Sequence, residues 1–153
     1  ALASERPAWQ WWALDASVEA LAVARRNAAR LGLDRIHFIR SDWYQAVAGR
    51  RFDLLVSNPP YIEIGDQHLH QGDVRFEPRS ALVADQAGMA DLAALIRAAS
   101  SHLNPGGWLL LEHGFAQGPQ VRQLLRAGGF AAVTTRRDMA GLERITGGCR
   151  NAD

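Results

Sequence analysis

The hydrophobic positions of this chain follow two different spacings along its length. Short apolar runs of β-type residues, typical of buried strands, alternate with segments where apolar residues recur about every three or four positions, typical of helices. The first residues, 1–6, resemble the last turn of a helix. The pattern further predicts strands over 9–14, 36–40, 52–57, 108–111, 130–136 and 144–146, and helices over 17–31, 89–102 and 119–127.

Strands that alternate with helices predict an α/β fold with a mostly parallel sheet. The last two predicted strands have no helix between them, so we expect the sheet to end in an antiparallel strand. Ligands of such sheets bind at the carboxyl ends of the strands. Polar residues occupy four of these predicted ends: Asp15, Asp42, Asn58 and Glu112.

The strand predicted over 52–57 ends in the sequence Asn58-Pro59-Pro60-Tyr61. Each proline lacks an N–H group and has φ fixed near about −65°, so the backbone leaves the sheet in a stiff, extended form. We expect this rigidity to direct the Asn58 side-chain amide and the Pro59 carbonyl toward one point. Both can accept hydrogen bonds from a planar –NH₂ group, and Tyr61 supplies a flat face beside them.

Two acceptors around an –NH₂ group suit methyl transfer to a nitrogen conjugated with a carbonyl or an aromatic ring. The lone pair of such a nitrogen is delocalised, which makes it a poor nucleophile. Acceptors that hold its hydrogens concentrate electron density on nitrogen and orient it, which is catalysis by positioning and electrostatics. The alternative is a turn in which Asn58 only caps the end of the strand.

Composition narrows the classes of function. A chain of 153 residues has room for one hydrophobic core, and its net charge of +1, with no basic run, argues against nucleic acid as a partner. The single cysteine, Cys149, excludes an internal disulfide and fits a reducing, cytoplasmic setting. No apolar run is long enough to span a membrane.

Residues 63–86 lack periodicity and are predicted to form a long loop, which in a compact domain usually has a function. His68 and His70 in this loop have a spacing that some metal sites use. No third ligand is suggested, so we predict a solvated loop and no metal site.

In combination these motifs resemble a known family. Asp15 at a strand end, Ser41-Asp42-Trp43 and the Asn58–Tyr61 motif are similar to class I S-adenosylmethionine-dependent methyltransferases that modify amino groups. The stretches 71–78 (QGDVRFEP) and 111–114 (LEHG) narrow the resemblance to the HemK-type (PrmC) enzymes, which methylate a glutamine side-chain amide in class I peptide chain release factors. The resemblance covers essentially the whole chain and implies a Rossmann-like fold.

The resemblance also implies a role for each matching residue. Asp15 would bind the ribose hydroxyls of S-adenosylmethionine, while Asp42 and Trp43 would flank its adenine. Asn58 would touch both cofactor and substrate. The substrate glutamine would be held by the motif Asn58, Pro59, Pro60 and Tyr61, in a pocket shaped further by Arg75, Phe76 and Glu77.

The chain departs from the family at its beginning. The family's Gly-rich loop, which follows its first strand, has no counterpart here, and neither has its N-terminal helical domain. We therefore expect residues 1–153 to be a partial catalytic domain truncated before the first strand. In the family that strand lies between those matching 9–14 and 52–57, so these two should lack a common neighbour. The isolated chain should bind S-adenosylmethionine weakly or not at all.

Three other functions remain open on the sequence alone. The glutamine could belong to a ribosomal protein rather than to a release factor. The amino group could be the N6 of adenine in nucleic acid, which has the same local electronics. The chain could also be an inactive remnant or interaction module that keeps the α/β fold.

Overall fold

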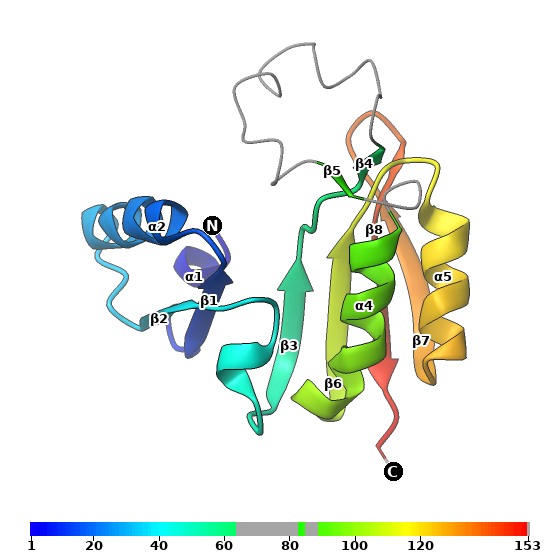
Figure 1. The fold of residues 1–153 in the computed structure, drawn as a ribbon, viewed down its shortest axis with the longest axis horizontal. Coiled ribbons are helices and arrows are strands. Elements are labelled where there is room, and N and C mark those ends of the chain that lie inside the picture. The colour runs from blue at the N-terminus through cyan, green and yellow to red at the C-terminus, as the bar shows by residue number, and fades with distance from the viewer. Residues whose placement is uncertain (64–82, 85–88, 153) are drawn as a thin grey trace. The chain divides into compact units, whose positions relative to one another are not determined.

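The computed structural model describes residues 1–63, 83–84 and 89–152 (Figure 1). These residues form two compact units, Ala1–Arg50 and Arg51–Asp153. Each unit has its own strands and helices, and each is considered by itself.

The first unit is a two-stranded parallel sheet with its connecting helix. Strands β1 (Trp11–Asp15) and β2 (Ile36–Arg40) pair in register from Trp11 with Ile36 to Asp15 with Arg40. Helix α2 (Val18–Arg30) joins them, as a parallel pair requires. A short helix, α1 (Leu2–Glu5), precedes β1, and a 3₁₀ turn, η1 (Gln45–Val47), follows β2.

Helix α2 begins and ends where its sequence signals predict. The Ser17 hydroxyl accepts a hydrogen bond from the Ala20 amide at 3.0 Å, as an N-cap does. Gly32 has φ +65° just after the helix, a conformation that glycine adopts without strain. Leu21 and Ala28 are buried on the predicted apolar face, whereas Val18, expected on the same face, is 51% exposed.

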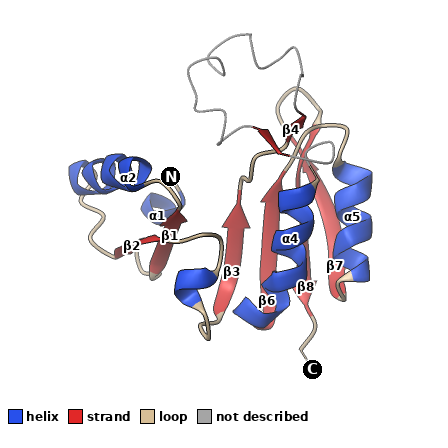
Figure 2. Ribbon diagram, viewed as in Figure 1, coloured by secondary structure: helices blue, strands red, loops and turns tan. Residues whose placement is uncertain are grey.

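The second unit contains a four-stranded sheet in the order β3-β6-β8-β7 (Figure 2). Its strands are β3 (Phe52–Ser57), β6 (Leu103–Glu112), β7 (Phe130–Arg137) and β8 (Glu143–Arg150). Strand β6 runs parallel to β3, and β8 runs antiparallel to both β6 and β7. Two short strands, β4 (Ile62–Glu63) and β5 (Val83–Ala84), form a separate parallel pair.

Two helices cover one face of this sheet. Helices α4 (Ala90–Ala99), which continues into the 3₁₀ turn η5 (Ser100–His102), and α5 (Gly118–Ala127) lie side by side against it (Figure 2). The core of this unit is aliphatic, and burying each such side chain contributes on the order of 1.5–3 kcal/mol. Its buried members include Leu92, Leu95, Ile96, Leu103, Leu109, Leu111, Val121, Leu125 and Phe130.

Three elements differ from the prediction. Residues 104–107, predicted as a turn, form an irregular part of β6, where the register with β3 shifts and Gly106 has φ +77°. Strand β8 covers eight residues rather than the three predicted, because Gly147 and Gly148 interrupt its apolar pattern. The predicted loop over 63–86 contains the β4–β5 pair, and its residues 64–82 and 85–86 lie outside the described part.

The predicted fold class is confirmed. Strands alternate with helices, the β1–β2 and β3–β6 pairs are parallel, and the antiparallel ending is present in β8. Among the described residues, β1 pairs with β2 and β3 pairs with β6, and neither has a second strand beside it in its own sheet. No helix in the described part of the chain is long and apolar enough to cross a membrane.

Candidate functional site

The first group of predicted site residues lies at the carboxyl end of the β1–β2 sheet. Asp15 is the last residue of β1 and pairs with Arg40, the last residue of β2, and Asp42 follows two positions later. The two strands are parallel, so Asp15 and Asp42 lie at the same edge of this sheet, as predicted.

Asp15 forms part of the turn that joins β1 to α2. Its carboxylate accepts a hydrogen bond from the Ser17 amide at 2.8 Å, which closes a turn between β1 and α2. The Ser17 hydroxyl in turn caps α2 and donates to Glu19 at 2.9 Å. A hydrogen bond with its own backbone and, after it, the one from the Ser17 hydroxyl lower the pKa of Glu19. Asp15 itself remains exposed.

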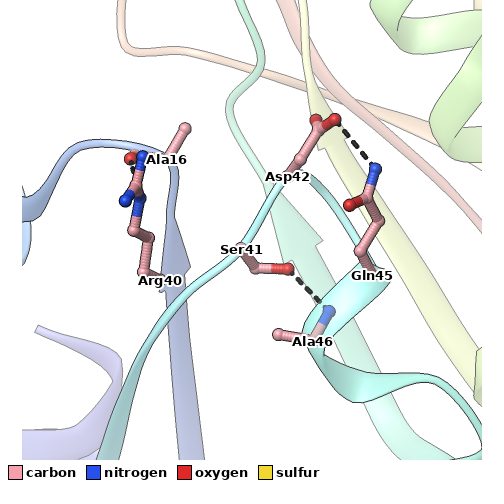
Figure 3. Close-up of a pocket in the computed structure, with 6 residues that line it drawn as sticks. All are labelled: Ala16, Arg40, Ser41, Asp42, Gln45 and Ala46. Atoms are coloured by element: carbon pink, nitrogen blue, oxygen red, sulfur yellow. Dashed lines mark hydrogen bonds between the residues drawn. The ribbon is translucent and has the colours of Figure 1, made fainter.

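A pocket of about 410 Å³ opens beside these residues (Figure 3). This volume lies within the ~300–1,000 Å³ usual for small-molecule sites. The pocket is lined by Ala16, Arg40, Ser41, Asp42, Gln45 and Ala46.

Hydrogen bonds fix the walls of this pocket. Arg40 Nε donates to the Ala16 carbonyl at 3.3 Å, which ties the ends of β1 and β2 together. Gln45 Nε2 donates to Asp42 Oδ2 at 2.9 Å, and the Ala46 amide donates to the Ser41 hydroxyl at 3.0 Å (Figure 3). Asp42 is exposed, so its carboxylate can still accept from the amino group of a ligand.

Trp43 does not line this pocket. It has φ 45°, which is uncommon for a residue with a side chain, and its carbonyl accepts a hydrogen bond from the Ser41 hydroxyl at 2.7 Å. Its side chain is 37% exposed. The neighbouring Tyr44 is half-buried, and burial raises the pKa of its hydroxyl to about 12, so it stays protonated at neutral pH.

The second group of predicted residues lies at the carboxyl ends of β3 and β6. Ser57 pairs with Leu111 in these parallel strands, so the next residues, Asn58 and Glu112, lie at one edge of the four-stranded sheet. Asn58 is exposed, and Pro59 directly after it is buried. The Asn58 amide is therefore accessible to a ligand, while the proline after it is packed against the protein.

Tyr61 closes the motif through contacts with the segment between β6 and α5. Its hydroxyl lies 3.4 Å from Glu112 Oε1, and its carbonyl accepts a hydrogen bond from Gln117 Nε2 at 3.1 Å. The Gln117 Oε1 atom accepts from the Gly114 amide at 2.8 Å. Asn58, Tyr61, Glu112 and Gln117 are therefore parts of one structural neighbourhood.

Behind this neighbourhood lies a fully buried histidine. His113 Nδ1 is 2.8 Å from the Gly114 carbonyl, and Nε2 is 2.7 Å from the Thr146 hydroxyl. A carbonyl only accepts, so Nδ1 carries the proton and Nε2 accepts from Thr146. Burial lowers the pKa of His113, which keeps the ring neutral at neutral pH.

A chain of polar contacts continues from this histidine to α5. Thr146 Oγ1 is 2.8 Å from Thr135 Oγ1, which accepts from Arg122 at 2.8 Å. Arg122 also binds Glu143 at 2.8 Å and holds the pKa of that carboxyl below its usual value. Every group in this chain has a partner, so it stabilises the base of the β6–α5 segment without offering a free acid or base.

Some predicted residues fall outside the described part of the chain. Arg75, Phe76 and Glu77, predicted to shape the substrate pocket, lie in 64–82, as do His68 and His70. In the ranges that the structure describes, no three His, Cys, Asp or Glu side chains are grouped so that they could hold a metal ion.

Comparison with known proteins places these motifs in a family context. Residues 1–74 match the family model described as the methyltransferase small domain. Over 145 residues, 95% of the chain, the sequence is 55% identical to the release factor glutamine methyltransferase of Pseudomonas aeruginosa and covers 52% of that protein. This chain is homologous to the release factor glutamine methyltransferases. It spans about half the length of these curated relatives.

Solved structures confirm that this release factor methyltransferase homologue has a class I methyltransferase fold. A methyltransferase from Pyrococcus furiosus matches with a TM-score of 0.72 at 19% identity, covering 98% of this chain and 67% of that one. The T. thermophilus 16S rRNA N2 G1207 methyltransferase in complex with AdoMet and guanosine matches with a TM-score of 0.65 at 18% identity. The match covers 93% of this chain and 32% of that one.

Sequence reasoning missed several residues around the site of this homologue. Arg40 and Gln45 line the pocket, but neither belongs to a motif, and an exposed Arg or Gln carries no signal of its own. Gln117 contacts Tyr61 across 56 positions of sequence. Glu112 was identified because it lies at a strand end. That position is the only signal that could have drawn attention to Gln117, which follows five residues later.

Proposed function

We propose that the protein containing this chain transfers a methyl group from S-adenosylmethionine to the side-chain amide nitrogen of a glutamine in a class I peptide chain release factor. The observation that carries this proposal is the 55% identity to a release factor glutamine methyltransferase over 95% of the chain. The single Cys149 fits a reducing, cytoplasmic setting for this activity.

The corner after β3 suits an amide substrate. The Asn58 side-chain oxygen and the Pro59 carbonyl would accept the two hydrogens of the glutamine –NH₂ group, while Tyr61 packs against its planar face. Holding both hydrogens turns the nitrogen lone pair toward the methyl donor. Arg75, Phe76 and Glu77 are proposed to shape the rest of the substrate pocket, as in the family that the sequence resembles.

The pocket beside β2 suits the adenosine part of the cofactor. Asp42, which lines the pocket, would accept from the adenine amino group. Trp43 and Asp15 do not line the pocket, and they are proposed to meet the cofactor at its edge: Trp43 on the adenine ring, and Asp15 on the ribose through the oxygen that does not receive the Ser17 amide. The bound cofactor supplies an electrophilic methyl group on a sulfonium. The N–C bond would form as the S–C bond breaks, with the electron pair of the broken bond left on sulfur and the extra proton of the nitrogen released to solvent.

The proposal is tested with the full-length protein and cofactor carrying a labelled methyl group. Release factor, the same release factor with its acceptor glutamine replaced by alanine, total ribosomal protein and duplex DNA are offered in parallel. Label is expected only in the release factor that keeps its acceptor glutamine. Label in ribosomal protein or DNA instead would replace the proposed substrate, and cofactor binding without transfer to any of them would support an inactive protein.

Asp42→Asn provides a check on the cofactor site. The exchange keeps the size of the side chain, but its amide can turn a donor toward the adenine amino group. We expect cofactor affinity to fall about tenfold, because one hydrogen bond to a charged acceptor is lost. The exposed Asp34, which lies between α2 and β2, serves as the matched control when it is changed to asparagine.

A further inference from the structure

Tyr61 is anchored to the β6–α5 segment by two contacts of unequal strength. The hydrogen bond from Gln117 Nε2 to the Tyr61 carbonyl is 3.1 Å long. The contact between the Tyr61 hydroxyl and Glu112 Oε1 is 3.4 Å, which is long for an O–H···O bond. The backbone contact made by Gln117 is therefore the stronger of the two, and it acts on the motif directly.

The two described hydrogen bonds of the Gln117 side chain agree on one orientation of its amide. Its oxygen accepts the Gly114 amide at 2.8 Å, so its –NH₂ group must face the Tyr61 carbonyl. The backbone N–H of Gln117 also donates a hydrogen bond, to the Gly114 carbonyl at 2.9 Å. A Cβ atom on residue 114 would lie 3.1 Å from Gln117 Oε1, so glycine at this position allows the close approach.

The support of Gln117 is itself rigid. The Gly114 carbonyl also accepts from the ring of His113, which is fully buried and held at its other nitrogen by Thr146 of β8. Gln117 therefore connects the Tyr61 backbone to the four-stranded sheet through Gly114 and His113.

The two ends of the motif are thus fixed by different elements. Ser57, directly before the motif, is fixed by its pairing with Leu111, and Tyr61 is fixed by Gln117. Between them, Pro59 and Pro60 each have a restricted φ, so few backbone torsions can change. A constraint on the Tyr61 carbonyl therefore also limits where the Asn58 amide and the Pro59 carbonyl can lie.

We propose that Gln117 is a positioning residue for methyl transfer. It does not touch the reacting atoms but holds the Asn58–Tyr61 corner so that its acceptors are aligned with the substrate amide. This inference rests on the proposed function, because it assigns the corner to substrate binding.

The substitution Gln117→Glu tests this inference in the full-length protein. It keeps the side-chain length and the acceptor for the Gly114 amide, but replaces the –NH₂ donor with an oxygen. At pH 8 the ionised carboxylate repels the Tyr61 carbonyl, and we expect kcat/KM for the release factor to fall about tenfold, which corresponds to the loss of one hydrogen bond.

Lower pH should restore the kcat/KM of Gln117→Glu. A residue that only stabilised the fold would not give this pH dependence. A protonated carboxyl carries an O–H group that can again donate to the Tyr61 carbonyl. A hydrogen bond made only by the neutral form raises the pKa of the introduced carboxyl above its usual value. The ratio of variant to wild-type kcat/KM is therefore expected to rise toward one as the pH falls from 8 toward 5.5.

Gln123→Glu is the matched control, because Gln123 is exposed on the same helix. Its rate ratio should stay near one at every pH, and both variants should keep the wild-type affinity for the cofactor. A carboxylate at the start of α5 suits the helix dipole, so Gln117→Glu should not lower the thermal midpoint. A Gln117→Glu protein with wild-type kcat/KM, or a low ratio that does not respond to pH, overturns the inference.

The experiments distinguish a failure of the proposed function from a failure of the inference about Gln117. A wild-type protein that leaves the release factor unmethylated refutes that function alone. The anchor is then tested by labelling tyrosine at its carbonyl carbon with ¹³C and assigning the Tyr61 signal by its loss in Tyr61→Phe. This signal should shift in Gln117→Glu at pH 8 and not in Gln123→Glu; an unchanged signal overturns the inference.

Discussion

Asn58 stands where an exposed polar side chain follows the partly exposed strand β3 and precedes a buried proline. The sequence had predicted that this strand is buried. The Ser57–Leu111 pairing fixes its backbone on one side, and Pro59 restricts it on the other. The side chain is thus presented to solvent from a rigid base, which is what an electrostatic role in methyl transfer requires.

Replacing Asn58 with alanine should lower kcat by about 100-fold, because a positioned acceptor is removed from the transition state. Steady-state kinetics of the full-length protein with release factor measure this effect. Asn27→Ala, an exposed substitution in the last turn of α2, should leave kcat unchanged. Wild-type turnover in Asn58→Ala would remove Asn58 from its proposed role.

At the scale of elements, β6, β7, β8 and α5 are joined by the polar chain that starts at His113. The folded protein lowers the pKa of His113 through burial, so the unfolded chain binds the proton more tightly. The free energy of unfolding therefore rises with pH between the lowered pKa of folded His113 and the pKa of histidine in the unfolded chain, which is about 6.5. It falls as the pH drops below about 6.5. Protonated Nε2 would also face Thr146 as a donor and reverse the hydrogen-bond chain.

The free energy of unfolding should consequently be lower at pH 5.5 than at pH 7.5. Urea denaturation at the two pH values measures the difference. His113→Gln should reduce the pH dependence, whereas His37→Gln, at an exposed position of β2, should retain it. Equal pH dependence in wild type and His113→Gln would contradict the assignment of the neutral ring.

The pairing of β6 with β8 depends on the absence of a side chain at position 147. A Cβ atom there would lie 2.6 Å from the backbone oxygen of Leu109, which cannot move without disturbing the sheet. Gly147→Val should therefore destabilise the protein by about 1–3 kcal/mol, as overpacking does. Thr134→Val, at the exposed β7 residue paired with Gly147, should change stability by less than about 0.5 kcal/mol in the same thermal or urea experiment.

At the scale of the whole molecule, the described residues form two units whose sheets do not share a strand pair. The pocket beside Asp42 is lined by residues of the first unit only, and the Asn58–Tyr61 corner belongs to the second.

The pocket beside Asp42 would hold only the adenosine part of S-adenosylmethionine, so we predict that the 153-residue chain by itself binds it weakly or not at all. Titration calorimetry on the isolated chain is expected to show no saturable heat at micromolar cofactor, while the full-length protein titrated in the same way should bind. Low-micromolar affinity of the isolated chain would contradict this prediction.

Local signals in the sequence were sufficient for much of the fold. Strands β2 and β3 occur over the predicted residues, Ser17 caps α2, and the polar residues at strand ends lie where a parallel arrangement requires. These features depend on residues close in sequence, whose periodicity, capping and turn preferences act over a few positions. The Asn58–Tyr61 motif belongs to this class, because its stiffness is a property of the prolines themselves.

The tertiary structure alone decided what joins residues distant in the sequence. The sequence by itself determined the order of strands and helices and the chemistry at each strand end. It could not give the length of β8, whose glycines are explained only by the close approach of β6, nor the anchoring of Tyr61 by Gln117, 56 positions away. Such contacts follow from the packing of whole elements, and no local preference of either residue encodes them.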